Sequence, residues 1–191
     1  GGGLMGGLLV GLVARLDPMK DHATFLDGAE QLVADGFRGH FLLVGEGLEA
    51  DGAFLGAQLR RRPALAGRVH GLGRRDDMTA INSALDLAVS TSIGEGFSNT
   101  IGEAMACETP VVATDVGDAA LIIGATGRLI PPGDPAALAR TVAELAALEP
   151  AARQDLGRQA RERMRSRFSL DRIMDDHGRF WEDMVGGDMM P

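Results

Sequence analysis

Short, continuous apolar runs alternate with stretches of helical periodicity along most of the chain. The runs have strand length and few polar interruptions, as expected for parallel strands that are buried on both faces. We expect strands at 8–14, 41–44, 69–72, 85–90, 110–114 and 127–130. Helices between successive strands make βαβ units, so the pattern predicts an α/β fold in which helices flank a parallel sheet in three layers.

Helices are expected between most of these strands and after the last one. The first has an apolar face between Phe25 and Val33 and ends at Gly36. Further helices are expected at 48–61, 76–84, 98–107, 135–148 and 150–167, with a last one within 170–185. We interpret the glycine-rich residues 1–7 as a linker or a remnant of cloning, 8–185 as one domain, and 186–191 as a tail.

Candidate chemistry gathers where the predicted strands end. Open parallel sheets bind ligands at the carboxyl ends of their strands. Arg15, Glu46, Gly73 and Glu95 each follow a predicted strand closely. The sequence therefore predicts that these residues share one edge of the sheet.

The segment from Glu95 to Cys107 carries most of the functional information. Glu95 precedes a helix that is expected to begin near Ser98, and Glu103 lies on that helix. A helix N-terminus presents unpaired N–H groups to phosphate or sugar oxygens, and carboxylates accept hydrogen bonds from sugar hydroxyls. The combination predicts a ligand that is both phosphorylated and polyhydroxylated, such as a nucleotide-sugar. Each carboxylate alone has an alternative interpretation, Glu103 as a partner of the helix dipole and Glu95 as an exposed loop acid.

Two cations follow the first predicted strand. Asp17 and Pro18 have the form of an N-cap and a first helical residue, which puts Lys20 in the first turn of the helix. A cation there opposes the helix dipole unless an anion lies nearby. A diphosphate held between Arg15 and Lys20 would supply that anion. The alternative is a pair of solvated cations balanced by Asp17 and Asp21.

Composition narrows the class of protein. The 191 residues have a formal net charge of −8, which argues against a broad nucleic-acid surface. Cys107 is the only cysteine, no apolar run is long enough to span a bilayer, and no signal peptide opens the chain, so we expect a cytoplasmic protein. The four histidines have no metal-ligand spacing and are expected to be surface or structural. No metal and no cofactor is predicted, since dinucleotide and Walker motifs are also absent from the sequence.

The stretch from Leu8 to Val185 resembles the C-terminal half of retaining glycosyltransferases of family four, which have the GT-B fold. Three motifs carry the resemblance: the segment from Arg15 to Lys20, the strand end at 43–47, and the element at 95–103 that leads into 109–117. The resemblance implies a Rossmann-like domain that is one half of a GT-B fold, with extra C-terminal helices. It also implies an enzyme that transfers sugar from a nucleotide-sugar with retention.

The resemblance implies roles for individual residues around the sugar and the diphosphate. Arg15 and Lys20 match the cations that grip the diphosphate, and the amides of Thr100 and Ile101 approach its distal phosphate. Glu95 hydrogen-bonds the transferred sugar and is the candidate catalytic residue. The amides that hold the other sugar hydroxyls match Phe97, Ser98 and Asn99.

The nucleoside has its own set of implied contacts. Glu103 matches the residue that binds the ribose diol, and Gly71, Leu72, Gly73 and Arg74 match the stretch beside the base.

For Glu95 we favour a positioning role over a nucleophilic one, because a diphosphate oxygen on the same face could take the proton of the acceptor.

The resemblance also implies a missing partner. A GT-B enzyme binds its acceptor on an N-terminal half, and this chain matches only the half that binds the sugar donor. We therefore expect the isolated domain to lack transfer activity. For the full-length enzyme, peripheral association with a membrane stays open. Two alternatives remain: a nucleotide-sugar epimerase domain and a nucleotide-binding module without chemistry.

Overall fold

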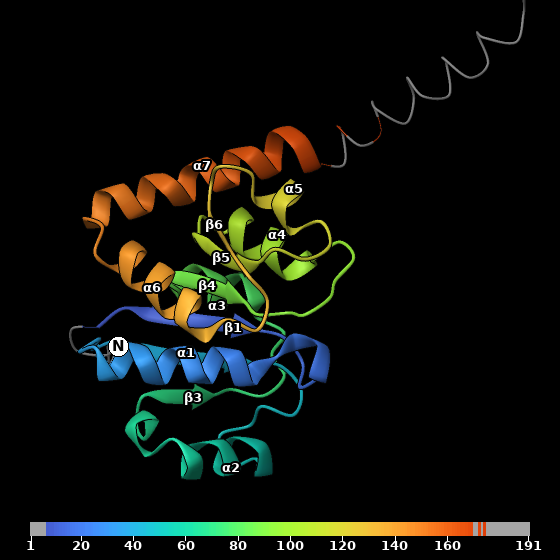
Figure 1. Cartoon of the computed structure of the whole chain (residues 1–191). Helices are drawn as coiled ribbons and strands as arrows, with labels where there is room; N and C mark the ends of the chain where they lie inside the picture. The colour runs from blue at the N-terminus through green and yellow to red at the C-terminus, as the bar shows by residue number, and fades with distance from the viewer. Residues whose placement is uncertain (1–6, 170–171, 173, 175–191) are drawn as a thin grey trace, which may run out of the picture.

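The fold is an open parallel sheet with helices on both faces. The computed structural model describes residues 7–169, 172 and 174, which form a six-stranded sheet in the order β3-β2-β1-β4-β5-β6 (Figure 1). The strands are β1 (Leu9–Val13), β2 (His40–Val44), β3 (Val69–Gly71), β4 (Leu87–Ser90), β5 (Val111–Thr114) and β6 (Arg128–Ile130). All neighbouring strands pair in parallel, so the predicted α/β class is confirmed.

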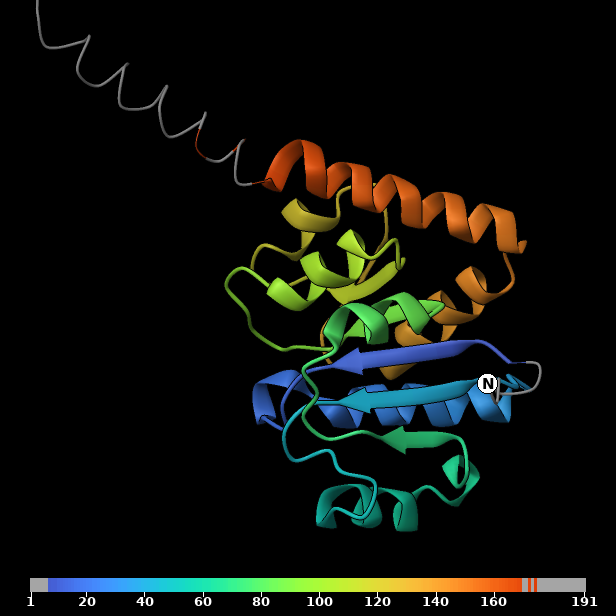
Figure 2. The same ribbon diagram turned by 180° about the vertical axis from the view of Figure 1, so that it is seen from behind.

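Two groups of helices cover the two faces of the sheet. The helices are α1 (His22–Ala34), α2 (Ala53–Arg61), α3 (Met78–Ala84), α4 (Asn99–Ala106), α5 (Ala119–Ile123), α6 (Pro135–Ala146) and α7 (Pro150–Phe168). Two short 3-10 helices, η1 (Pro18–Lys20) and η2 (Pro63–Leu65), complete the described elements. Figure 1 shows α1 in front of β1 and β2, and Figure 2 shows the same strands from behind with α1 on their far side.

Alternating side chains of each strand supply two separate cores. On β1, Val10 and Leu12 pack with α1, α2, η2 and α6, whereas Leu9 and Val13 pack with α3, α4, α5 and α7. Strand residues point alternately to opposite faces, so a strand covered on both faces must be apolar throughout. This requirement explains why the strands appear in the sequence as continuous apolar runs.

The helix predicted at 48–61 begins later than expected. α2 starts at Ala53, and the preceding residues are held by the two residues that follow β3 instead of forming a turn of helix. The carbonyl of Leu48 accepts a hydrogen bond from the amide of Gly73 at 3.0 Å, and Glu49 forms an isolated antiparallel bridge with Leu72. These long-range backbone bonds outweigh the local helical periodicity.

Other boundaries differ less. The helix predicted at 76–84 begins at Met78, the strand predicted at 85–90 begins at Leu87, and the short helix α5 was not predicted. Its sequence Ala-Ala-Leu-Ile-Ile is apolar enough to be mistaken for part of a strand region. The helix expected within 170–185 lies outside the described residues, apart from Arg172 and Met174.

α7 approaches the rest of the domain closely at one glycine. It packs against α4, and a Cβ at Gly157 would lie 1.9 Å from the carbonyl oxygen of Glu108. Glu108 itself has a positive φ of 62°, so the segment it occupies has little freedom to withdraw.

Two glycines in helix interiors allow a matched test of this contact. Gly157→Ala should lower the free energy of unfolding by about 1–3 kcal/mol through overpacking. Gly56→Ala on α2 should instead raise it by about 0.5–1 kcal/mol, because its Cβ would meet only the tip of Arg60 at 3.4 Å. Urea denaturation measures both. Equal effects of the two substitutions would show that α7 is not held by this contact.

Candidate functional site

An opening forms where the direction of the chain across the sheet reverses. β1 and β4 are neighbours, but the chain leaves β1 toward α1 on one face and leaves β4 toward α4 on the other. Such a reversal separates the loops at the carboxyl ends of the two strands, which is where open α/β sheets bind ligands. A small cavity there is lined by the two strand ends together with Lys20, Ser92, Glu95 and Thr100.

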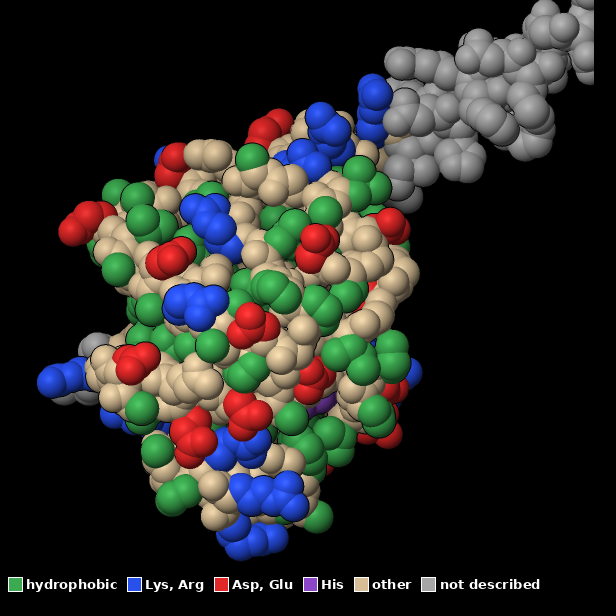
Figure 3. Space-filling model, viewed as in Figure 1, with side chains coloured by type: hydrophobic (Ala, Val, Ile, Leu, Met, Phe, Trp, Pro, Cys, Tyr) green, Lys and Arg blue, Asp and Glu red, His purple; other side chains and the backbone are tan. Residues whose placement is uncertain are grey.

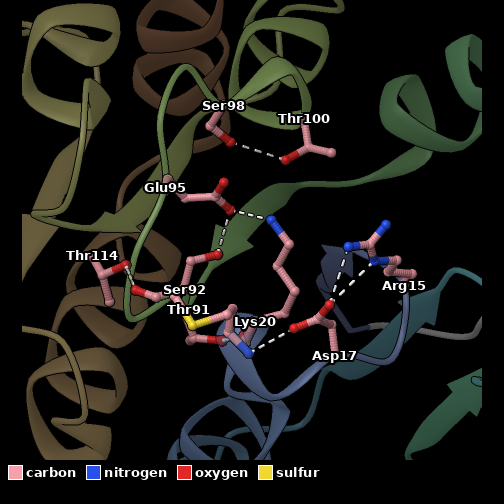
Figure 4. A network of polar contacts seen from close by, with 10 residues as sticks. Arg15, Asp17, Lys20, Thr91, Ser92, Glu95, Ser98, Thr100 and Thr114 are labelled. Carbon is pink, nitrogen blue, oxygen red and sulfur yellow. Dashed lines mark hydrogen bonds and ion pairs between the residues drawn. The ribbon is translucent and has the colours of Figure 1, made fainter.

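Asp17 and Pro18 are the N-cap and the first helical residue, as predicted, and Lys20 lies in the turn that they begin. That turn is the separate 3-10 helix η1, so its expected continuation into α1 was wrong. Asp17 caps η1 by accepting a hydrogen bond from the amide of Met19 at 2.9 Å. Asp21 then adopts left-handed backbone angles and caps α1 through the amide and hydroxyl of Thr24. This break between η1 and α1 points the Lys20 side chain toward the end of β4, as Figure 4 shows.

Lys20 and Glu95 form an ion pair at the centre of the opening. The Lys20 ammonium donates to Glu95 Oε1, and the side chains are 25% and 16% exposed. The same carboxylate oxygen accepts a hydrogen bond from the Ser92 hydroxyl at 2.7 Å (Figure 4). The structure thus brings together two residues that the sequence assigned to different parts of one ligand.

Hydrogen bonds lower the pKa of Glu95. Partial burial acts to raise it, but the bonds from Lys20 and Ser92 and the charge of Lys20 outweigh burial. The carboxyl group is therefore ionised at neutral pH, and the Lys20 ammonium faces a full negative charge. Lys20 and Glu95 are thus the cation and the anion that line this cavity.

Buried hydroxyl groups fix the loops that carry this pair. The Thr91 hydroxyl donates to the carbonyl oxygens of Lys20 and Asp21 at 2.9 and 3.0 Å, which joins η1 to the end of β4. The Thr114 hydroxyl, on β5, donates to the Ser92 carbonyl at 2.5 Å. Thr91, Ser92 and Thr114 were not predicted as site residues, although hydroxyl residues that directly end an apolar strand were a usable signal.

Arg15 lies on the same edge but outside the ion pair. Its guanidinium pairs with Asp17 at 3.1 Å, and its side chain is 71% exposed. In Figure 4, Asp17 lies between Arg15 and the Lys20–Glu95 pair. The hydrogen bond from the Met19 amide is the main cause that lowers the pKa of Asp17, so this carboxylate is also ionised.

The N-terminus of α4 faces the opening without a side-chain cap. Ser98 is the N-cap residue, but its hydroxyl contacts the Thr100 hydroxyl at 3.2 Å and makes no capping hydrogen bond. The first amides of a helix have no partner within it, so those of Asn99, Thr100 and Ile101 are available to an anion. α4 ends at Ala106, and Cys107 is its C-cap.

The remaining predicted residues do not line this cavity. Glu103 is exposed on α4, and Phe97 is exposed and contacts the ring of Phe168. The stretch from Gly71 to Arg74 is held at the same edge by backbone bonds, with the Gly73 carbonyl accepting from Gly45 at 2.9 Å. Leu72 and Arg74 are exposed there.

The described histidines are structural in different ways. His22 is buried against Phe54, its Nε2 has no hydrogen-bond partner among the described residues, and burial lowers its pKa. His22 is therefore structural but only partly satisfied, whereas a surface or fully satisfied histidine had been expected. His40 and His70 lie on neighbouring strands with Nδ1 and Nε2 3.0 Å apart, and burial followed by the charge of His40 lowers the pKa of His70. Among the described residues, no three metal-binding side chains cluster.

The surface carries both signs of charge. On the face that bears α1, acidic and basic side chains are interspersed, apart from a small basic group over α2 (Figure 3). Within the described part of the chain, no helix has the length and apolarity to cross a membrane.

Comparison with known proteins identifies the family. The chain belongs to the glycosyl transferases group 1 family, whose model matches residues 7–147. It is 35% identical over 124 residues to a lipopolysaccharide core biosynthesis mannosyltransferase from Rhizobium leguminosarum bv. viciae, covering 64% of this chain and 35% of that protein. It is 31% identical over 149 residues to N-acetyl-alpha-D-glucosaminyl L-malate synthase from Bacillus anthracis, covering 77% and 38%.

A solved structure shows the same architecture. Anabaena HepE in complex with UDP superposes with a TM-score of 0.80 at 29% identity, covering 93% of this chain and 49% of HepE. The GT-B-type, Rossmann-like fold expected from the sequence is thereby confirmed. The chain spans little more than a third of the two curated relatives and about half of HepE.

One glycine places the Glu95 loop, and it can be tested against a matched glycine. Gly117 has a φ of +53°, and a Cβ there would lie 2.2 Å from the Glu95 carbonyl oxygen. Gly133 has a φ of +68° with nothing within 4 Å of its Cβ position. Gly133→Ala should destabilise the fold by about 1–2 kcal/mol through backbone strain alone. Gly117→Ala should destabilise it more and shift the NMR signal of the Glu95 amide. Equal losses in urea denaturation would show that the Glu95 loop does not depend on this approach.

Proposed function

We propose that this chain is the part of a retaining glycosyltransferase that binds a nucleotide-sugar. The observation that carries the proposal is the opening between β1 and β4, which holds a cation, a carboxylate and an uncapped helix N-terminus. These groups suit a ligand with a diphosphate and a sugar. HepE, which is similar over nearly the whole chain, has been solved with UDP and with UDP-glucose.

In the proposed complex, positive groups surround the diphosphate. Lys20 contributes a point charge, and Arg15 contributes a forked pair of donors after turning away from Asp17. The amides of Thr100 and Ile101 approach the distal phosphate at the positive end of α4. Once the nucleotide-sugar is bound, these groups stand in place before its bond breaks, so they stabilise the negative charge that develops on the leaving diphosphate.

The proposed sugar and nucleoside sites lie on either side of the diphosphate. Glu95 accepts hydrogen bonds from sugar hydroxyls, with help from the amides of Phe97, Ser98 and Asn99. Glu103 accepts from the ribose diol. The stretch from Gly71 to Arg74 lies along the base and is already held in place by the loop after β2.

The proposed reaction breaks the bond between the sugar C1 and the diphosphate oxygen. A new bond forms from C1 to an acceptor hydroxyl on the same face, and the proton of that hydroxyl passes to the leaving diphosphate. Glu95 positions the sugar in this scheme and does not attack C1.

The acceptor would be held by an N-terminal domain outside this chain, and we propose that the whole enzyme works in the cytoplasm. Orientation of two substrates can supply ~7–11 kcal/mol of barrier lowering, so the isolated domain should bind without transferring sugar.

Calorimetry with UDP, GDP and ADP tests the assignment of the diphosphate. Replacing both Arg15 and Lys20 by Ala should weaken the best ligand by ~3 kcal/mol or more, since each charge-assisted hydrogen bond contributes ~1.5–3 kcal/mol. Arg60→Ala, which removes an exposed charge on α2, should leave binding unchanged. Retention of affinity by the double variant would contradict the assignment of the diphosphate site.

The ribose assignment has its own test. Glu103→Gln should weaken UDP by about tenfold, because a hydrogen bond to a charged acceptor becomes one to a neutral acceptor. It should have a smaller effect on 2′-deoxy-UDP, which keeps only one of the two proposed hydroxyl partners. Glu144→Gln is the matched control, an exposed carboxylate on α6 away from the site. Equal losses for UDP and the deoxy analogue would remove Glu103 from the ribose site.

A further inference from the structure

We propose that Glu95 makes the site selective for the sugar-bearing nucleotide over the bare nucleotide by competing with the diphosphate for Lys20. The inference rests on the proposed function, because it concerns the same ligand. Its basis is the ion pair itself, which joins the residue proposed for the diphosphate to the residue proposed for the sugar. A diphosphate must therefore take Lys20 from a partner that already holds it.

Burial makes this exchange unfavourable for the bare nucleotide. The Glu95 side chain is 16% exposed, so water cannot fully replace Lys20 as its partner. After Lys20 leaves, the Ser92 hydroxyl is the one remaining side-chain donor to the carboxylate among the described residues. A partly buried carboxylate that loses its cation is destabilised, and that loss reduces the affinity for the bare nucleotide.

A sugar reverses this effect. Lys20 and Ser92 both donate to Oε1 of Glu95, which leaves Oε2 without a side-chain partner among the described residues. Hydroxyl groups of a bound sugar can donate to this oxygen and to the position that Lys20 gives up. The carboxylate is then satisfied again, so the nucleotide-sugar binds without the loss that the bare nucleotide suffers.

The chemistry of the cation suits an exchange. Lys20 is the only lysine in the chain, so the site has its one ammonium group at a position where an arginine could have stood. An ammonium is a compact charge on a flexible stem and can pass from one anion to another, whereas a guanidinium fork would hold both carboxylate oxygens. Thr91 fixes the backbone at Lys20, so the exchange needs movement of the side chain alone.

The inference predicts that removing the charge of Glu95 improves binding of the bare nucleotide. Glu95→Gln should bind UDP about fivefold more tightly or better in calorimetry, since Lys20 is no longer held by a full charge. The same variant should bind UDP-glucose no more tightly than the parent, so that the preference for the sugar-bearing ligand is lost. Glu144→Gln should change neither affinity.

A double-mutant cycle separates the exchange from simple repulsion between Glu95 and the diphosphate. In a Lys20→Met background, Glu95→Gln should no longer tighten UDP binding, whereas repulsion alone would still give the gain.

Three outcomes would overturn the inference. Unchanged UDP affinity in Glu95→Gln would mean that Lys20 serves both anions at once. A gain that persists without Lys20 would assign the effect to repulsion. No binding of UDP, GDP or ADP by the parent chain would overturn the proposed function and this inference with it, whereas the first two outcomes leave the proposed function in place.

Discussion

The pairing of β1 with β4 is the constraint on which the site depends. These adjacent parallel strands send their following segments to opposite faces, since α1 packs in one core and α4 in the other. No loop can cover both strand ends at once, so the edge stays open there and the N-terminus of α4 points into it. Strand order alone therefore creates the opening, and the side chains only determine what it can hold.

Around this opening, the domain uses backbone contacts for position and side chains for chemistry. The stretch after β3 is bound to the loop after β2 through Gly45, Leu48 and Gly73. The loop after β4 is bound to η1 and β5 through buried hydroxyls. Lys20 and Glu95 are separated by 75 positions in the sequence, yet they meet because both of their loops are fixed in this way.

The sequence predicts the sheet well and the site only in outline. A run such as Phe41–Val44 has to be apolar throughout because both faces of β2 are covered, and this makes strands easy to recognise. The start of α2 and the break between η1 and α1 were missed, because they depend on a bridge from Glu49 to Leu72 and on left-handed angles at Asp21. Neither feature leaves a local pattern. The ion pair was missed for the same reason, since the two residues were assigned separately to a ligand and not to each other.

The buried hydroxyls of Thr91, Ser92 and Thr114 also determine whether the loops around the opening lose their conformational entropy on folding or on ligand binding. Each is at most 2% exposed and bonded to another part of the domain, so the loops around the opening are ordered as the domain folds. A ligand that arrives later has little backbone left to immobilise, and less of its binding energy is spent on ordering the protein. Three small side chains, none of them a proposed ligand contact, thereby transfer part of the entropic cost of recognition from the binding step to the folding step.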